Sequence, residues 1–156
     1  MKHLQLRNRQ RDRSINLQIL RQVCTALLED ELKFSDYELA IHLVSPRVMA
    51  DMNERFLNHT GPTDVITFDF REGYDPALAK LNLAGEIYIC VAVAEKQAAE
   101  FSTTWQEEVA RYIVHGVLHL IGHDDLVLEK RRILKREENR LVKALSRRFD
   151  FSVISA

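Results

Sequence analysis

One segment constrains this fold more than any other: residues 105–121 have a helical pattern with almost no polar side. The run from residue 113 to residue 121, IVHGVLHLI, is apolar apart from one glycine and two histidines. A helix that is apolar nearly all round is buried, so its polar side chains must find partners inside the protein. Because His115 and His119 are four residues apart, both imidazoles project from one face, one turn apart. We expect a buried helix that carries a paired histidine site.

Shorter strands and amphipathic helices are predicted around this helix. Alternating or continuous apolar runs predict strands, and apolar residues at helical spacing predict helices. Ser14 and the pair Ser45-Pro46 each indicate the start of a helix. The predicted strands cover residues 2–7, 37–44, 65–70 and 84–91, and the predicted helices cover 15–27, 46–56, 93–101, 105–121 and 126–148. Only a polar loop, 71–82, joins the last two strands, so they can pair antiparallel. The order of elements indicates an α+β fold with a small mixed sheet packed with helices.

The composition is that of a single globular domain covering residues 1–156. The 156 residues are 46% hydrophobic and 29% charged, and no repeat or linker marks a boundary within them. Cys24 and Cys90 are too few for a disulfide scaffold and are expected to be buried thiols. The chain has no apolar signal segment at its start and no stretch long enough to span a membrane, so we expect a cytoplasmic protein.

The net charge of −1 is an average over unlike regions. Residues 1–14 carry +4, residues 15–125 carry −10, and residues 126–148 carry +6. An acidic centre can hold a cation, and basic ends can contact the phosphates of a polyanion without reading its sequence. Solvated helices are often as charged as this, so charge by itself does not decide between the two interpretations.

The spacing His-x3-His-x2-Gly-x2-Asp extends the histidine pair toward a third ligand. Gly122 permits a sharp reversal that can bring Asp125 back to His115 and His119. This matches the ligand arrangement of zincins, in which a fourth position stays open for water. His123 is the rival third ligand, although it directly follows the turn. The spacing therefore predicts a site for one metal ion with an open position for water.

Three blocks of this sequence resemble those of the YbeY-type endoribonucleases, which are rRNA maturation factors. The run HGVLHLIGHDD at 115–125 resembles the family pattern H-G-x-L-H-x-x-G-Y-D-H. The run PTDVITF at 62–68 is similar to P-T-D-V-L-S-F, and Gly85-Glu86-Ile87 is similar to G-D-I. The resemblance covers roughly residues 38–125 in order and spacing, and the histidine block is its most specific part.

The resemblance implies a zincin-like, metalloprotease-type fold and a single-strand-specific, metal-dependent endoribonuclease. It implies a role in 16S rRNA 3′-end maturation and in ribosome quality control. The implied catalytic and metal-binding residues are His115, His119 and Asp125, holding one Zn²⁺ ion. The implied partners are single-stranded RNA, rRNA and the small ribosomal subunit, with neither DNA nor a membrane.

The sequence departs from the family pattern at two places. Asp125 stands where the family has a third histidine, and His123 stands where it has tyrosine. A carboxylate ligand should make a zinc-bound water less acidic than a third imidazole would. Leu57 stands where many members carry an arginine ahead of the PTDV block, and Arg55 or His59 is a candidate to replace it.

Other positions keep further roles and functions open. Gly116 occupies the place of the glutamate in the HExxH motif, which disfavours a metallopeptidase-like hydrolase. Asp64, Glu86 and Glu108 could each orient water or a ligand histidine, or could equally be a turn cap, a solvated strand residue and an exposed helix residue. A non-catalytic metal-binding ribosome-assembly factor is the other alternative.

Overall fold

A four-stranded mixed sheet forms the centre of the molecule in the computed structural model, which describes residues 1–156. Its strands are β1 (Lys2–Arg9), β2 (Tyr37–Val44), β3 (Val65–Asp69) and β4 (Leu83–Cys90). The helices are α1 (Leu17–Thr25), α2 (Pro46–Leu57), α3 (Pro76–Ala79), α4 (Val91–Phe101), α5 (Trp105–Leu120) and α6 (Leu128–Arg148). A π-helical turn at Ala26–Glu31 continues α1, and a 3-10 turn covers Phe151–Ile154. The α+β class and the mixed sheet are as predicted.

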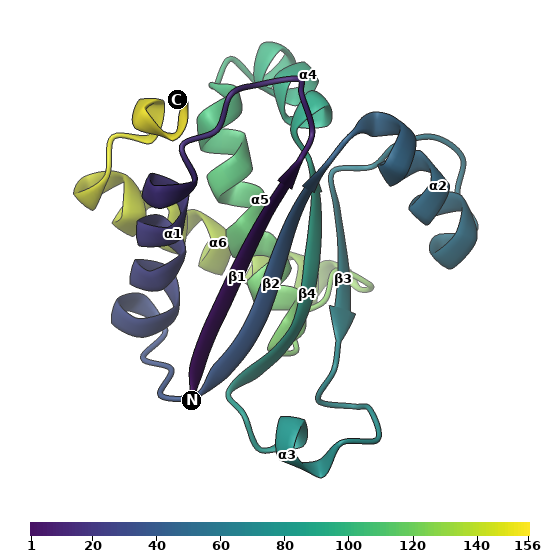
Figure 1. Ribbon diagram of the computed structural model, residues 1–156, viewed down its shortest axis with the longest axis vertical. Coiled ribbons are helices and arrows are strands. Elements are labelled where there is room, and N and C mark those ends of the chain that lie inside the picture. The colour runs from purple at the N-terminus through teal and green to yellow at the C-terminus, as the bar shows by residue number, and fades with distance from the viewer.

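The strand order in the sheet is β1-β2-β4-β3. β1, β2 and β4 run parallel, and β3 pairs antiparallel with β4, which confirms the predicted pairing. Figure 1 shows α5 and α6 behind the sheet, with α2 beyond β3 at the other side. Because α5 contacts β3, β4 and α6, it lies between the sheet and the last helix.

The core lies between the sheet and α5. Ile41 on β2 and Ile87 and Ile89 on β4 have no exposed surface, and neither have Val117 and Leu118 on α5. These residues belong to one cluster of apolar side chains that joins the strands to the helices. The buried apolar helix predicted from the sequence is therefore confirmed.

Gly116 lies where α5 comes closest to the sheet. A Cβ atom at this position would come within 2.9 Å of two side-chain carbons of Ile87. Protein interiors are close-packed, so a larger side chain fits here only if Ile87 and α5 move apart. The residue between the two histidines is therefore a packing position that faces β4.

Of the two predicted helix starts, one is confirmed and the other is wrong. Ser45 accepts a hydrogen bond from the backbone N–H of Val48 and caps α2, as predicted. The predicted cap at Ser14 is wrong, since Asn16 caps α1 instead. Ile15 forms an isolated β-bridge with Ser155, which holds the backbone before Asn16 extended.

The two cysteines are buried free thiols, as predicted. Burial raises the pKa of Cys24 to about 12, so this thiol stays protonated and unreactive at neutral pH. None of the helices is both long enough and apolar enough to cross a membrane.

Replacing Gly85 by alanine should destabilise the sheet. Gly85 is buried on β4, and a Cβ atom there would overlap the carbonyl oxygen of Phe68 on β3, which is backbone and cannot rotate away. Overpacking of this kind costs about 1–3 kcal/mol. Urea unfolding should show a loss of this size for Gly85→Ala. Gly73→Ala, in the loop before α3, is the control with less crowding, because a Cβ atom there would stay 3.3 Å from the nearest atom, the carbonyl oxygen of Phe70. An equal loss in both variants would contradict the close approach of β3 and β4.

Candidate metal centre

α5 presents two imidazoles to one point, as the spacing predicts. The Nε2 atoms of His115 and His119 lie 3.0 Å apart. Two nitrogen ligands at the usual distance from a tetrahedral zinc ion stand about 3.3 Å apart. The pair can therefore hold one ion, and the chemistry of its donor atoms suits zinc.

The turn after α5 brings a carboxylate to the histidines. Gly122 has a φ angle of 107°, the left-handed conformation that the sequence predicted for it. The ligand atoms of His115, His119 and Asp125 all lie within 4.8 Å of one another. His123 is outside this group, and its backbone N–H bonds to the carbonyl of Leu118. The structure thus brings together the three residues named from the sequence.

A fourth residue at the site, Glu138 on α6, was missed by the sequence reasoning. Its Oε1 lies 2.6 Å from Nδ1 of His115, and its side chain is only 4% exposed. When the ring donates its Nδ1–H to this carboxylate, Nε2 keeps a free lone pair for a metal. A signal was present: Glu138 is an acid on the buried stripe of α6 that also holds Leu134, Leu141 and Leu145.

The buried carboxylate is held charged by its neighbours. Arg111 and Lys135 both contact its Oε2, at 2.8 Å and 3.1 Å. Burial raises the pKa of Glu138, but hydrogen bonds from His115 and Arg111 outweigh it and bring the pKa to about 2. Burial, together with the neighbouring His115, lowers the pKa of His119. His119 therefore favours the neutral form, which is the form that binds a metal.

The three other carboxylates considered from the sequence lie in different places. Glu86 is on the far face of the sheet from α5, where its Oε2 lies 2.8 Å from Nε2 of His42. Asp64 caps the backbone N–H of Val65 and also lines the cavity beside His115. Glu108 is buried, not exposed as an ordinary helix glutamate would be, and lines the same cavity.

This cavity has a volume of about 430 Å³ and adjoins His115. It lies between α4, α5 and α6, and Arg111, Arg131 and Lys135 supply positive charge to its wall. Neither Arg55 nor His59 lines it. The cations beside the histidines therefore come from α5 and α6 and not from the segment before β3.

Comparison with known proteins relates this chain to one family. The family model described as Endoribonuclease YbeY matches residues 5–146. Proteins named Endoribonuclease YbeY from Thermotoga petrophila and Chlorobium luteolum are 36% and 37% identical to this chain. The first alignment covers 62% of this chain and 61% of the relative, and the second covers 67% and 72%. The solution structure of TM1509 from Thermotoga maritima matches with a TM-score of 0.62 at 23% identity, over 91% of this chain and 88% of that one. This last match shows the fold.

Replacing Glu138 by glutamine should remove an acid-sensitive part of the stability of the metal-free protein. The folded-state pKa of about 2 lies below the ordinary value of 4.5. The charge therefore stabilises the fold at every pH above 4.5, and this stabilisation is lost as the pH falls toward 2. A shift of this size corresponds to roughly 3 kcal/mol.

The measurement is urea unfolding of chelator-treated protein at several pH values. Between about pH 5 and pH 3 the wild type should lose more stability than Glu138→Gln. Glu137→Gln is the neighbouring control, because Glu137 pairs with Arg140 at the surface. The same pH dependence in Glu138→Gln as in the wild type would rule out this role of the carboxylate.

Proposed function

This chain belongs to the YbeY endoribonuclease family, and from that premise we propose that it is a metal-dependent endoribonuclease acting on single-stranded RNA. The observation that carries the proposal is the cluster of His115, His119 and Asp125 beside a cavity with a basic wall. Two imidazoles and one carboxylate are a donor set that suits zinc. We assign one Zn²⁺ ion to these three residues.

The side chains around the cluster have separate tasks. A zinc ion bound here would supply Lewis acidity and make water a better nucleophile at neutral pH. Glu138 holds the proton on Nδ1 of His115, which fixes the ring with Nε2 toward the ion. Burial keeps His119 neutral by lowering its pKa, so the second imidazole also offers a lone pair. Asp125 contributes the one negative charge among the three ligands.

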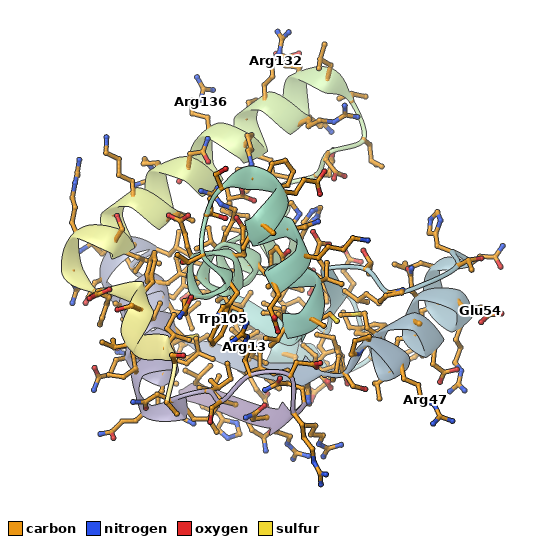
Figure 2. The ribbon with its side chains drawn as sticks, turned by 90° about the horizontal axis from the view of Figure 1, so that it is seen from above. Arg13, Arg47, Glu54, Trp105, Arg132 and Arg136 are labelled. Atoms are coloured by element: carbon orange, nitrogen blue, oxygen red, sulfur yellow. The ribbon has the colours of Figure 1, made fainter.

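Positive side chains near the cluster suit a phosphate substrate. Arg111, Arg131 and Lys135 line the cavity, and each can donate to phosphate oxygens. Arg132 and Arg136 lie on the side of α6 turned away from the sheet, as Figure 2 shows, and neither has an acidic partner. We propose that the RNA strand runs along α6 and enters the site from there.

The basic N-terminal segment, residues 1–14, contributes less to this surface. β1 lies at the front of the sheet in Figure 1, and α6 lies behind it. Arg13 is also engaged within the protein, since it pairs with Glu95 and lies over the ring of Trp105. The basic ends are therefore on opposite sides of the molecule, and we assign the RNA contacts to α6.

Peptide hydrolysis of the HExxH type is not favoured by this site. The general base of that motif would stand at Gly116, which packs against Ile87 in the core. A glutamate at that position would have no route to a substrate. A non-catalytic assembly factor is the remaining alternative, and an RNA cleavage assay separates it from the enzyme.

The biological setting proposed for this activity follows the family. We infer that the substrate is rRNA, in 16S 3′-end maturation and ribosome quality control, with the small ribosomal subunit as partner. The reaction would take place in the cytoplasm and would involve neither DNA nor a membrane. Comparison of 16S 3′ ends in cells with and without the protein tests this setting.

Alanine at His115, His119 or Asp125 should abolish both metal binding and RNA cleavage. Each substitution removes one of three ligands, while His123→Ala leaves all three in place. The measurements are the metal content of the purified protein and cleavage of an unstructured RNA with and without chelator. Metal loss in His123→Ala but not in Asp125→Ala would overturn the assignment of the third ligand.

Glutamine at Glu138 should weaken metal binding about 10- to 100-fold without removing a ligand, as substitutions behind a ligand histidine do. Glutamine keeps the shape of the side chain but loses the charge that holds the Nδ1 proton of His115. Competition with a chromogenic chelator measures the zinc affinity. Glu137→Gln should keep wild-type affinity, because its carboxylate faces Arg140 and not the histidines. Equal affinities in both variants would contradict the positioning role of Glu138.

A further inference from the structure

The cavity beside His115 is larger than a metal site requires. It extends from the histidine to Phe101 at the end of α4, and its volume of about 430 Å³ is in the range of sites that hold small organic ligands. Its walls carry carboxylate, amide, guanidinium and aromatic groups from three helices. The cavity therefore has room for an organic group next to the proposed ion.

A buried carboxylate on the wall of this cavity has one oxygen without a protein partner. Glu108 is only 5% exposed, and its Oε1 accepts a hydrogen bond of 2.6 Å from the hydroxyl of Thr103. Its other oxygen, Oε2, has no hydrogen bond to the protein, and no ion pair reaches the side chain. Because Oε2 is not a fully buried atom, it is open to the cavity that Glu108 lines. There it can accept an N–H or O–H hydrogen bond from water or from a ligand that displaces the water.

Two amide side chains on the cavity wall have NH₂ groups that can donate hydrogen bonds. Oε1 of Gln97 accepts a hydrogen bond from the hydroxyl of Tyr112, and Oδ1 of Asn139 accepts one of 2.7 Å from Arg111. Both amide oxygens are thus occupied, while both NH₂ groups remain free to donate. The cavity therefore offers donors as well as an acceptor, which suits a ligand with both kinds of group along one edge.

An aromatic ring stands at the entrance. Phe101 lines the cavity, and 63% of its surface is exposed. An exposed phenylalanine next to cationic side chains is the usual platform on which a base of a single nucleic-acid strand stacks. Phe101 is therefore the exposed aromatic ring of a lining that also includes Tyr112 and Leu134.

We propose that this cavity holds one unpaired nucleobase of the RNA, stacked on Phe101 and donating hydrogen bonds to Glu108. The proposal rests on the proposed function for the identity of the polymer. The phosphate next to the bound base then lies toward His115, within reach of Arg111 and Lys135. A base in a duplex cannot enter the cavity without leaving its stack, so the cavity selects for single strands.

The carboxylate also selects among the bases. Guanine presents two adjacent donors, N1–H and the N2 amino group, with the O6 acceptor beside them. Uracil presents a single N3–H between two carbonyl oxygens, which a carboxylate repels. The cavity therefore prefers guanine to uracil.

Guanosine and uridine 5′-monophosphates test the proposal, because neither can be cleaved and binding is read separately from catalysis. NMR titration of the full chain should show that guanosine monophosphate binds about tenfold more tightly than uridine monophosphate. Phe101→Ala should weaken both about tenfold, as loss of a stacking ring does. Glu108→Gln keeps the bond to Thr103 and should remove most of the preference for guanine. Phe101→Trp should retain binding.

Phe56→Ala is the matched control, since Phe56 is an aromatic residue of α2 that is 55% exposed and does not line the cavity. Thermal melting of each variant checks that the fold is intact. Wild-type affinity and base preference in both Phe101→Ala and Glu108→Gln would overturn the proposal, even if the protein cleaves RNA. If the protein does not cleave RNA but binds guanosine monophosphate through Phe101 and Glu108, the proposed function fails and the assignment of the cavity stands.

Discussion

The contact between Glu138 and His115 is the interaction on which the rest of the site depends. A carboxylate that is 4% exposed must be compensated inside the protein, and here three basic side chains from α5 and α6 surround it. Removing one of them would leave the buried charge less well compensated. The same contact joins α5 to α6 and favours the Nδ1–H tautomer of the histidine, and Glu138 also lines the cavity. Glu138 therefore contributes both to the contact between α5 and α6 and to the orientation of the ligand histidine.

Within one turn, one side of α5 packs against the sheet and another side carries the two histidines of the site. Gly116 lets the helix approach β4, with Ile87 against its backbone. His115 and His119 lie on another side, beside α6 and the turn that carries Asp125. Because the glycine position is committed to the core, the site receives its carboxylates from elsewhere: Glu138 on α6, and Asp125 after the turn. This differs from the HExxH arrangement, in which the general base comes from the same helix as the histidines.

The charged residues are also divided into those that hold the site together and those that face solvent. The acidic centre of the chain includes Asp125 and the buried Glu108, and two of the basic residues of α6, Arg131 and Lys135, line the cavity that adjoins them. Arg111 and Lys135 neutralise Glu138, and Arg131 donates to the backbone of Asp125. Part of the positive charge of α6 is therefore used to hold the site together. The rest faces outward, where a polyanion can reach it.

Features that depend on local spacing could be predicted from the amino-acid sequence. The period of three to four residues identified α5, the glycine turn indicated Asp125, and the loop between β3 and β4 predicted their antiparallel pairing. Features that join residues far apart in the chain could be seen only in the folded protein. Glu138 is 23 residues from His115, and the cavity takes its walls from three helices. Periodicity shows which face of a helix is buried but not which partner covers it, and for that reason Glu138 and the environment of Glu108 emerged only from the packing of α5 against α4 and α6.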